Sequence, residues 1–363
     1  MMSKYFLFFA IGGFWTTLVL AMVFLFGRTH DVKLREYNRA RNVMGFAYIF
    51  FASIILFEVT SRFLGFHHPG FKTSILIFSI FQLLIFTQVN ISLINLSFLP
   101  IRKLLYHMLP VTILGILSIL SYNLKWGFNL STIILYSLLL LYVVSVIIFG
   151  LIFTIHYKSY KKKFENYFTE DSTNHLKWVY TSNVLIQSVG IIAVVITLIF
   201  PATINLFPFL VILFYTAYAI HFLNYKNVLH LVEPVVKEDL IEETDKHSKT
   251  SLLTLKQIES ALKIWEEKKL FTCPRLTISI IASQISTNRT YLSHYLNSSK
   301  EKTFSDWINE LRIEEAKKLM KANKSLRLEE VSEQVGYTDK CYFSRCFLKY
   351  TGINVSQWKN SQI

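Results

Sequence analysis

The sequence predicts an all-α protein in two parts: an N-terminal seven-helix transmembrane bundle and a C-terminal soluble domain. Three observations predict this architecture. Residues 1–224 contain seven apolar runs long enough to cross a bilayer, residues 255–363 repeat apolar residues at helical spacing, and the composition changes near Asn224. The expected boundaries are 1–224 for the bundle, 225–254 for a polar linker and 255–363 for the soluble domain.

The two parts also differ in charge. The 363-residue chain carries a net charge of +14, with 16 Lys and Arg against 6 Asp and Glu before residue 225, and 22 against 18 from there on. The stretch 233–245 is acidic, whereas the chain from Phe271 onward is more basic. This distribution suits a linker followed by a domain that approaches phosphate groups.

The bundle is predicted from run length alone. A helix needs about 20 mainly apolar residues to cross the hydrocarbon core. The runs are approximately 5–26, 43–64, 74–96, 104–124, 131–155, 179–200 and 206–223, and the fourth is interrupted by His107 and Pro110. One lysine precedes the first run and no small-residue cleavage site follows it, which favours a retained helix over a removed signal peptide.

The loop charges predict an orientation, because Lys and Arg concentrate on the cytoplasmic side. With the N-terminus outside, only Lys4, Arg62, Lys72 and Lys125 lie on the outer side. The cytoplasmic segments then hold Arg28, Lys33, Arg35, Arg39, Arg41, Arg102, Lys103, Lys158, Lys161, Lys162, Lys163 and Lys177. We therefore expect a multi-pass protein of the bacterial cytoplasmic membrane whose C-terminal domain lies in the cytoplasm.

Several polar residues fall at membrane depth, where ionisable groups are costly and often functional. They are Glu58, Gln82, Gln88, Asn90, Asn95, His107, Asn183 and Gln187. An ion pair of Glu58 with Arg62 and hydrogen bonds of the amides between helices are the simpler explanation, and a ligand-binding role stays open. The outer loops are too short to fold a separate sensor domain.

The soluble domain begins with a helix of about a dozen residues before Thr272, marked by Ile258, Leu262 and Trp265. An apolar stripe within 276–285 predicts a second helix, which Thr277 can cap. After a break at Ser286 and Thr287, Asn288 can cap a helix over 289–297. A short helix, a tight turn and a second helix with a small polar outer face form a helix-turn-helix unit.

The same pattern then recurs. A long amphipathic helix is predicted over 305–323, followed by an apolar stripe within 328–335, a turn at Gly336 and a last helix over 339–349. The long helix would measure about 28 Å at about 1.5 Å per residue. Successive major grooves of B-DNA lie about 34 Å apart, so two recognition helices held by this spacer could enter neighbouring grooves.

The segment 265–358 resembles the DNA-binding domain of the AraC family of transcriptional regulators. The resemblance rests on Asn-Arg-Thr-Tyr-Leu-Ser at 288–293, Leu-Arg-Ile-Glu-Glu-Ala-Lys-Lys-Leu at 311–319, Val-Gly-Tyr at 335–337, Tyr-Phe-Ser-Arg at 342–345 and Phe-Leu-Lys-Tyr-Thr-Gly at 347–352. The family's layout implies two helix-turn-helix units joined by a long helix. Nothing in residues 1–224 resembles a soluble sugar-binding domain, so sugar sensing is not implied.

By position, the resemblance implies two sets of DNA-contacting residues. In the first recognition helix, Thr290, Ser293 and His294 would meet base edges, with Arg289 and Asn297 nearer the phosphates; in the second, Lys340, Cys341, Ser344 and Arg345 would meet bases, with Lys349 at the backbone. The chain departs from the family's pattern at four places: Thr290 and His294 replace longer or more basic side chains, Ser286-Thr287 lacks a turn glycine, Arg327 stands where a capping serine is usual, and Ser332 replaces a small alanine. Arg345 also has a competing role, since it could bind phosphate or brace Asp339.

Together these features favour a membrane-tethered, sequence-specific DNA-binding regulator that responds to a signal. The alternatives are a transporter or channel with a regulatory DNA-binding tail, and a bundle that is only a passive anchor. The chain shows no phosphate-cradling glycine loop and no metal-spaced His and Cys, so neither an enzyme nor a cofactor is expected. Expected partners are double-stranded DNA and membrane lipid, with RNA polymerase, a second copy and an unidentified signal ligand as further candidates.

Overall fold

Helices make up nearly all of the computed structural model, which describes residues 4–27, 35–63, 71–95, 101–123, 128–169, 174–199, 207–228 and 252–361. Within these ranges the only extended pairing is an isolated antiparallel bridge between Phe168 and Thr277. The all-α prediction is confirmed. The chain divides into an N-terminal unit, Met1–Lys158 with Leu176–Glu233, and a C-terminal unit, Ser159–His175 with Pro234–Ile363.

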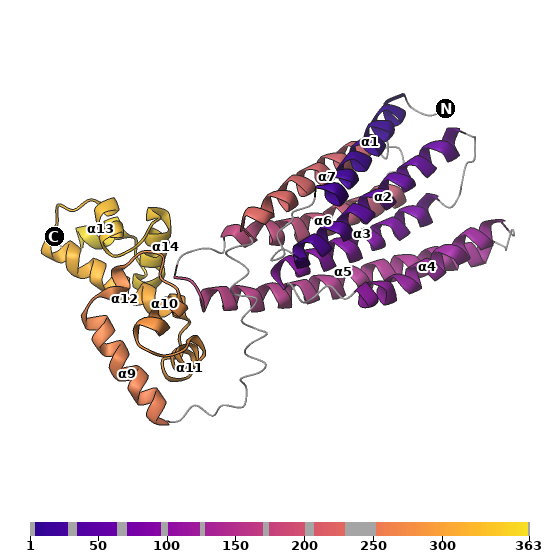
Figure 1. The fold of residues 1–363 in the computed structure, drawn as a ribbon. Helices are drawn as coiled ribbons and strands as arrows, with labels where there is room; N and C mark the ends of the chain where they lie inside the picture. Colours follow the sequence, from indigo (N-terminus) through magenta and orange to yellow (C-terminus); the bar gives the residue numbers. More distant parts are fainter. Residues whose placement is uncertain are drawn as a thin grey trace. The chain divides into compact units, whose positions relative to one another are not determined.

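The apolar runs of the first part all form helices (Figure 1). They are α1 (Lys4–Phe26), α2 (Arg35–Phe63), α3 (Phe71–Ile94), α4 (Ile101–Asn123), α5 (Phe128–Glu165), α6 (Asn174–Ile199) and α7 (Phe207–Asn224), which continues into a 3-10 turn, Tyr225–Val228. Among the described residues, five helices, α1, α2, α3, α5 and α6, are long and apolar enough to cross a membrane. The apolar parts of α4 and α7 are shorter. Seven membrane crossings therefore stay a prediction.

These helices carry large apolar side chains on their outer surface as well as inside. Phe8 is 73% exposed, Leu140 67% and Ile147 57%. A helix that is apolar all round suits a hydrocarbon environment, since a soluble protein rarely exposes wide apolar patches to water. By contrast, 78% of the apolar stretch of α3 is buried, which places α3 in the interior of the N-terminal unit.

An aromatic cluster packs α2, α3 and α7 together. The Tyr215 ring stacks on Phe51, with 5.1 Å between centroids and 11° between planes, and on Phe86 at 5.7 Å. The Tyr48 hydroxyl donates to the Tyr215 carbonyl oxygen at 2.7 Å. Aromatic pairs add about 0.5–1.5 kcal/mol beyond their buried area, so this cluster supplies much of the specific packing between these helices.

One membrane-depth amide links three helices. Asn90 of α3 donates to the Ser182 hydroxyl of α6 at 3.3 Å and accepts from the Tyr218 hydroxyl of α7 at 2.8 Å. This agrees with the expectation that such amides hydrogen-bond between helices. Gln82, Gln88 and Asn183 are buried too, and one amide atom of each finds no hydrogen-bond partner among the described residues. The side chains of Glu58 and Arg62 lie outside the described set.

Arg41, predicted among the cytoplasmic loop charges, is 2% exposed inside the N-terminal unit. Its guanidinium donates to the carbonyl oxygen of Gly27, the residue that follows α1. A cation at a helix C-terminus is favoured by the helix dipole and satisfies a carbonyl that has no partner within the helix. This explains how a charged side chain can be buried at this position.

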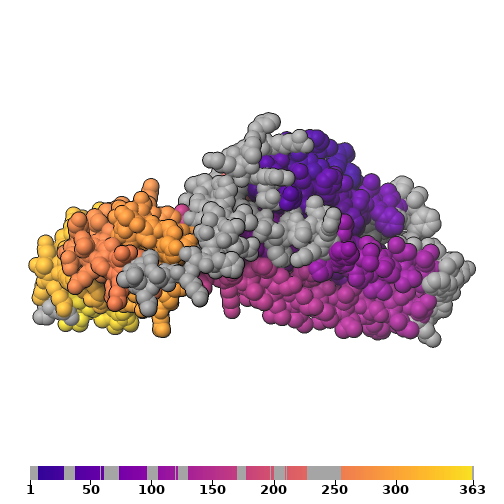
Figure 2. All heavy atoms as spheres, turned by 60° about the horizontal axis from the view of Figure 1, so that its bottom comes forward, coloured from indigo at the N-terminus to yellow at the C-terminus, as the bar shows by residue number. Residues whose placement is uncertain are grey.

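The C-terminal unit is a compact set of helices. It contains α9 (Leu252–Glu267), a 3-10 turn (Leu270–Thr272), α10 (Ile278–Gln284), α11 (Arg289–Ser299), α12 (Phe304–Ala322), α13 (Leu328–Gln334), α14 (Lys340–Thr351) and α15 (Val355–Asn360). Figure 2 shows the atoms of these helices, orange to yellow, closely packed against one another. The unit also includes residues 159–175, which differs from the predicted boundaries; the predicted linker lies mostly outside the described residues.

Side-chain caps fix where the helices of this unit begin. Asn288 Oδ1 accepts from the Tyr291 amide at 2.8 Å, Thr277 Oγ1 from Ile280 at 3.3 Å, and Asp339 Oδ1 from Cys341 at 2.7 Å. Such caps are each worth about 1 kcal/mol. They set the first turn of α10 and of both candidate recognition helices, α11 and α14.

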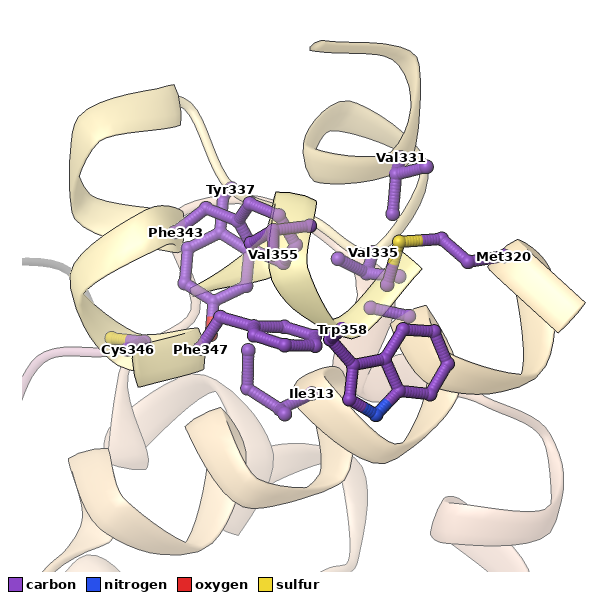
Figure 3. Packing of buried hydrophobic residues seen from close by; sticks show 11 residues of the cluster. Ile313, Met320, Val331, Val335, Tyr337, Phe343, Cys346, Phe347, Val355 and Trp358 are labelled. Atoms are coloured by element: carbon purple, nitrogen blue, oxygen red, sulfur yellow. The ribbon is translucent and has the colours of Figure 1, made fainter. Parts of the chain in front are cut away.

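A hydrophobic cluster holds the second helix-turn-helix unit to α12 (Figure 3). Ile313 and Met320 of α12 pack with Val331 and Val335 of α13 and with residues of α14 and α15. The Phe347 ring lies 5.9 Å from Phe343 and 5.8 Å from Trp358, measured between centroids. The short helix α15, which the sequence analysis did not predict, therefore closes one side of this cluster.

Candidate nucleic-acid interface

Two helix-turn-helix units share α12 as their spacer. The first is α10, a turn and α11; the second is α13, a turn and α14. The spacer α12 has 19 residues and differs from the predicted helix by one residue at each end. Its length of about 28 Å compares with the groove repeat of about 34 Å. The predicted order of elements is confirmed.

The two turns use different residues for the same left-handed backbone. Gly336 has φ 91° in the second turn, and Ser286 has φ 56° in the first. Left-handed backbone favours glycine because it has no Cβ to clash with the following carbonyl. The first turn therefore has the same left-handed conformation without a glycine, and Ser286 adopts it under strain.

Replacing Ser286 by glycine is expected to stabilise the C-terminal unit by about 0.5–1 kcal/mol, since relief of the left-handed strain exceeds the added chain entropy. Hydrogen-exchange mass spectrometry on the full chain, following peptides from α10 and α11, measures the change. Ser283→Gly is the matched control: this exposed serine lies inside α10, where glycine costs about 0.5–1 kcal/mol. A loss of protection at Ser286→Gly would contradict the strain argument.

The first recognition helix, α11, presents most of its predicted contacts to solvent. Thr290, His294 and Asn297 are exposed and Ser293 is half-buried. The opposite side of α11 packs inward through Leu292, Tyr295 and Leu296. The exposed side chains are held along the helix, for example by Asn297 Nδ2 donating to Ser293 Oγ at 3.3 Å. The helix thus presents one polar face to solvent and one apolar face to the core.

Arg289, at the first position of α11, differs from its neighbours. It is half-buried, and its guanidinium carbon lies 5.2 Å from the centre of the Tyr167 ring. Burial lowers the pKa of Arg289 from its usual value, and Tyr167 acts in the opposite direction. The side chain predicted to contact a phosphate is therefore engaged within the protein.

The second recognition helix, α14, exposes Lys340, Cys341, Arg345 and Lys349, and half-buries Ser344. The guanidinium of Arg345 lies over the Tyr342 ring at 5.7 Å. Asp339, proposed from sequence as a brace for Arg345, caps α14 through the Cys341 amide. Stacking on Tyr342 orients the planar Arg345 guanidinium, a group whose fork of donors suits base recognition.

Two lysines of α14 form ion pairs with carboxylates of other helices. Lys340 Nζ lies 2.6 Å from Glu329 of α13, and this contact raises the pKa of Lys340. Lys349 Nζ lies 2.6 Å from Asp306 of α12, which also accepts from the Tyr350 hydroxyl at 2.7 Å. Burial tends to raise the pKa of Asp306, but hydrogen bonds from Lys349, Tyr350 and Thr303 lower it overall. With the predicted contacts, Lys340 would have to leave Glu329 to meet a base edge, and Lys349 would have to leave Asp306 to meet a phosphate.

A buried arginine connects the two units, a role that the sequence analysis did not assign. Arg312 of α12 has no exposed surface. Its Nε donates to the Phe271 carbonyl at 2.8 Å and its Nη2 to the Cys273 carbonyl at 2.7 Å, while its guanidinium lies 5.2 Å from the Tyr337 ring. Arg312 therefore holds the chain before the first unit and the turn of the second unit to the same helix.

The second feature missed from sequence is a docked segment, residues 159–169, which we call the connector. It comprises the last residues of α5 and the chain after them. Four of its side chains are buried: Tyr160, Phe164, Tyr167 and Thr169. The aromatic residues Tyr160, Phe164 and Phe168 are spaced as on one face of a helix, and this pattern could have indicated a buried segment. The sequence analysis counted only the neighbouring Lys161–Lys163, as cytoplasmic loop charges.

The described residues contain no group of three or more His, Cys, Asp or Glu side chains that could hold a metal ion. Cys273 and Cys341 are exposed, Cys346 is buried, and all three are free thiols. The polar faces of α11 and α14 are therefore the features of this unit that call for a functional explanation.

The C-terminal region is similar to known proteins. A family model described as a helix-turn-helix domain matches residues 281–361. The chain is 33% identical over 76 residues to the uncharacterized transcriptional regulatory protein YesN of Bacillus subtilis, which covers 21% of each chain. It is 32% identical over 84 residues to the uncharacterized HTH-type transcriptional regulator YijO of Escherichia coli, covering 23% of this chain and 29% of YijO.

A third relative, the uncharacterized HTH-type transcriptional regulator YobQ of Bacillus subtilis, is 30% identical over 136 residues, 37% of this chain and 48% of YobQ. The chain thus spans less than half the length of each of these three relatives. No solved structure matches the chain.

Proposed function

We propose that the chain is a DNA-binding transcription regulator, not an enzyme, and that it acts from the bacterial cytoplasmic membrane; a helix-turn-helix family model matches residues 281–361, and relatives similar to this region are named transcriptional regulators. In this proposal α1–α7 form a multi-pass anchor, and the C-terminal domain binds specific DNA sites from the cytoplasm. The N-terminal unit responds to a signal and changes the activity of the domain.

Sequence-specific binding is supported mainly by the exposed polar faces of α11 and α14, two helices separated by the 19-residue α12. A spacer of about 28 Å suits two helices that enter major grooves about 34 Å apart on one side of a duplex. One copy of the domain would then cover more than one turn of DNA. A single helix-turn-helix would read only one groove.

We assign the contacts as follows. Thr290, Ser293 and His294 of α11 and Lys340, Cys341, Ser344 and Arg345 of α14 meet base edges, while Arg289, Asn297 and Lys349 meet phosphates. The exposure of seven of these ten side chains supports the assignment. Arg345 is the best candidate for guanine, because its stacked guanidinium offers paired donors to O6 and N7.

Arg345→Ala is expected to weaken binding to a selected site by about 1–3 kcal/mol, the value of one base-specific pair, and to relax sequence preference at one position. The measurement is fluorescence anisotropy with the full chain in lipid nanodiscs and a duplex selected from a random pool. Lys324→Ala is the matched control, because Lys324 is an exposed cation outside both recognition helices. Equal losses for the two variants would refute a base-reading role for Arg345.

Membrane tethering is supported by the five helices of spanning length and by the large apolar side chains on the outside of the bundle. It predicts that the chain stays in the membrane pellet after carbonate extraction and that a C-terminal reporter is active in the cytoplasm. Recovery of the protein in the soluble fraction would refute the tether. Besides DNA, the expected partners of the protein are membrane lipid, RNA polymerase and a second copy of the chain.

The signal response is supported by polar side chains inside the N-terminal unit, where Gln82, Gln88 and Asn183 are buried. Polar groups at membrane depth are costly to bury and are therefore candidates for a functional role such as binding a signal. Replacing residues 1–158 and 176–233 by an unrelated anchor of equal topology tests the response. If regulated transcription survives this replacement, the bundle is a passive anchor. A separate flux assay with the full chain in proteoliposomes tests the other alternative, because substrate flux would favour a transporter or channel.

A further inference from the structure

The connector is bound to the C-terminal unit by backbone and side-chain hydrogen bonds, as a short strand would be. The Ile278 amide donates to the Tyr167 carbonyl at 3.1 Å, and Thr169 Oγ1 donates to the Leu276 carbonyl at 3.1 Å. Phe168 and Thr277 form the isolated antiparallel bridge between these contacts. Thr169 has no exposed surface. The connector therefore occupies a site at the start of α10.

Thr169 also reaches the spacer and the second recognition helix. The Thr169 carbonyl accepts from Asn309 Nδ2 of α12 at 3.3 Å and from the Tyr342 hydroxyl of α14 at 3.2 Å. Asn309, which is buried, also donates to Tyr342. One carbonyl thus joins the spacer to α14, while the preceding residues hold α10. The connector is bound where the two helix-turn-helix units meet.

The contact with Arg289 links the connector to DNA binding. Arg289 and Tyr342 lie in the first turn of α11 and of α14, and N-terminal turns of recognition helices are the parts that enter the groove. Tyr167 holds the Arg289 guanidinium over its ring. Arg289 is half-buried against the connector, whereas Arg345 is exposed, so burial and not stacking limits the access of Arg289 to a phosphate.

We propose that the docked connector is an autoinhibitory element that withholds Arg289 from DNA and fixes the spacing of the two recognition helices. This deepens the proposed function and rests on it. The connector contains the C-terminal end of α5, a helix of membrane-spanning length, so a rearrangement of α5 would reach the connector along the same helix. Undocking the connector releases Arg289 and raises the affinity for DNA.

The first test uses Tyr167→Ala in the full chain, reconstituted in nanodiscs, with a labelled 30-base-pair duplex of arbitrary sequence. Affinity for such DNA depends on phosphate contacts, and each added contact steepens the slope of log affinity against log salt by about one. Tyr167→Ala should bind more tightly at low salt and show that steeper slope. Tyr167→Phe, which keeps the ring, is the control and should bind like the parent.

A double-mutant cycle assigns the gain to Arg289. Arg289→Ala should reduce affinity more in the Tyr167→Ala background than in the parent, because only there does Arg289 reach a phosphate. An equal loss in both backgrounds would overturn the proposal. So would weaker DNA binding by Tyr167→Ala, because that result would make the connector a required part of the binding surface.

A disulfide lock tests docking without removing the Tyr167 ring. Phe168→Cys with Thr277→Cys, in a chain carrying Cys273→Ser and Cys341→Ser, places two thiols at the isolated bridge. Antiparallel bridge partners lie about 4.5–5.5 Å apart between Cα atoms, within the range of a disulfide. Oxidation should weaken DNA binding and reduction should restore it. Equal binding by the oxidised and reduced forms would overturn the proposal.

The outcomes distinguish this inference from the proposed function. If the parent and both connector variants fail to bind any duplex at low salt, the proposed DNA-binding function fails. If they bind DNA but neither Tyr167→Ala nor oxidation changes the affinity, only the autoinhibitory role fails. Hydrogen exchange at peptides covering 159–169 verifies in each case that the connector was released or held.

Discussion

Arg312→Ala is expected to destabilise the C-terminal unit by about 4 kcal/mol. The substitution leaves the buried Phe271 carbonyl and the part-buried Cys273 carbonyl without their Arg312 donors, at about 1–3 kcal/mol for the buried one and less for the other, and opens a cavity beside Tyr337. Both helix-turn-helix units should lose protection, because Arg312 contacts the chain before the first and the turn of the second. Hydrogen-exchange mass spectrometry on the full chain measures the loss peptide by peptide.

Arg312→Met separates the two causes. Methionine fills most of the space but cannot donate, so we expect this variant to lose about 2–3 kcal/mol, the hydrogen-bonding share alone. If peptides of α13 and α14 lost protection while those of α10 and α11 did not, the idea that Arg312 joins the two units would be wrong. If Met and Ala behaved alike, packing would contribute nothing at this position.

Gly336→Ala is the second substitution with a large expected effect, a loss of about 3–5 kcal/mol. The backbone of Gly336 is left-handed, with φ 91°, and an added Cβ would lie 2.3 Å from the Thr272 carbonyl oxygen. That oxygen is backbone and cannot move aside as a flexible side chain could. The turn must therefore shift, and with it the position of α14 relative to α13. Loss of specific DNA binding should accompany the loss of stability.

Gly352→Ala is the matched control. Gly352 follows α14 with φ 77°, but an added Cβ there meets nothing within 4 Å. Only the left-handed backbone is penalised, at about 1–2 kcal/mol. Both variants are unfolded by heat while hydrogen-exchange protection of peptides from α13 and α14 is measured. The difference between their losses of stability is the contribution of the contact between the added Cβ and Thr272. Equal losses would show that this contact is not limiting.

Local signals allowed much of the C-terminal fold to be predicted. Thr277 and Asn288 were identifiable as caps because Thr277 directly precedes an apolar stripe and Asn288 precedes one by three residues, and both accept hydrogen bonds from the expected amides. At Arg327 the missing capping serine is offset by Glu330, whose carboxylate accepts from the Arg327 amide at 2.7 Å. The helix α15 was missed because its six residues are too few to show a period.

Contacts between distant segments could not be predicted. The hydrogen bond from Asn309 to Thr169 joins residues 140 positions apart, and Lys349 meets Asp306 across 43. No spacing rule relates such pairs, since their approach depends on how the helices pack. Arg289 is an example. Its position in the sequence indicated a phosphate contact, but in the structure its guanidinium lies over the Tyr167 ring. The contact residues themselves remain a prediction.

The ion pairs of α14 have a kinetic consequence. Lys340 and Lys349 are each partly neutralised by a carboxylate, so the second recognition helix attracts random DNA less than its sequence suggests. Weak non-specific attraction shortens the time spent on incorrect sites, because that attraction depends mainly on phosphate contacts. We therefore expect rapid dissociation from non-target DNA. In the proposed tethered state the protein must wait for its site to come within reach, and rapid release from other DNA would leave its binding surface unoccupied when that site arrives.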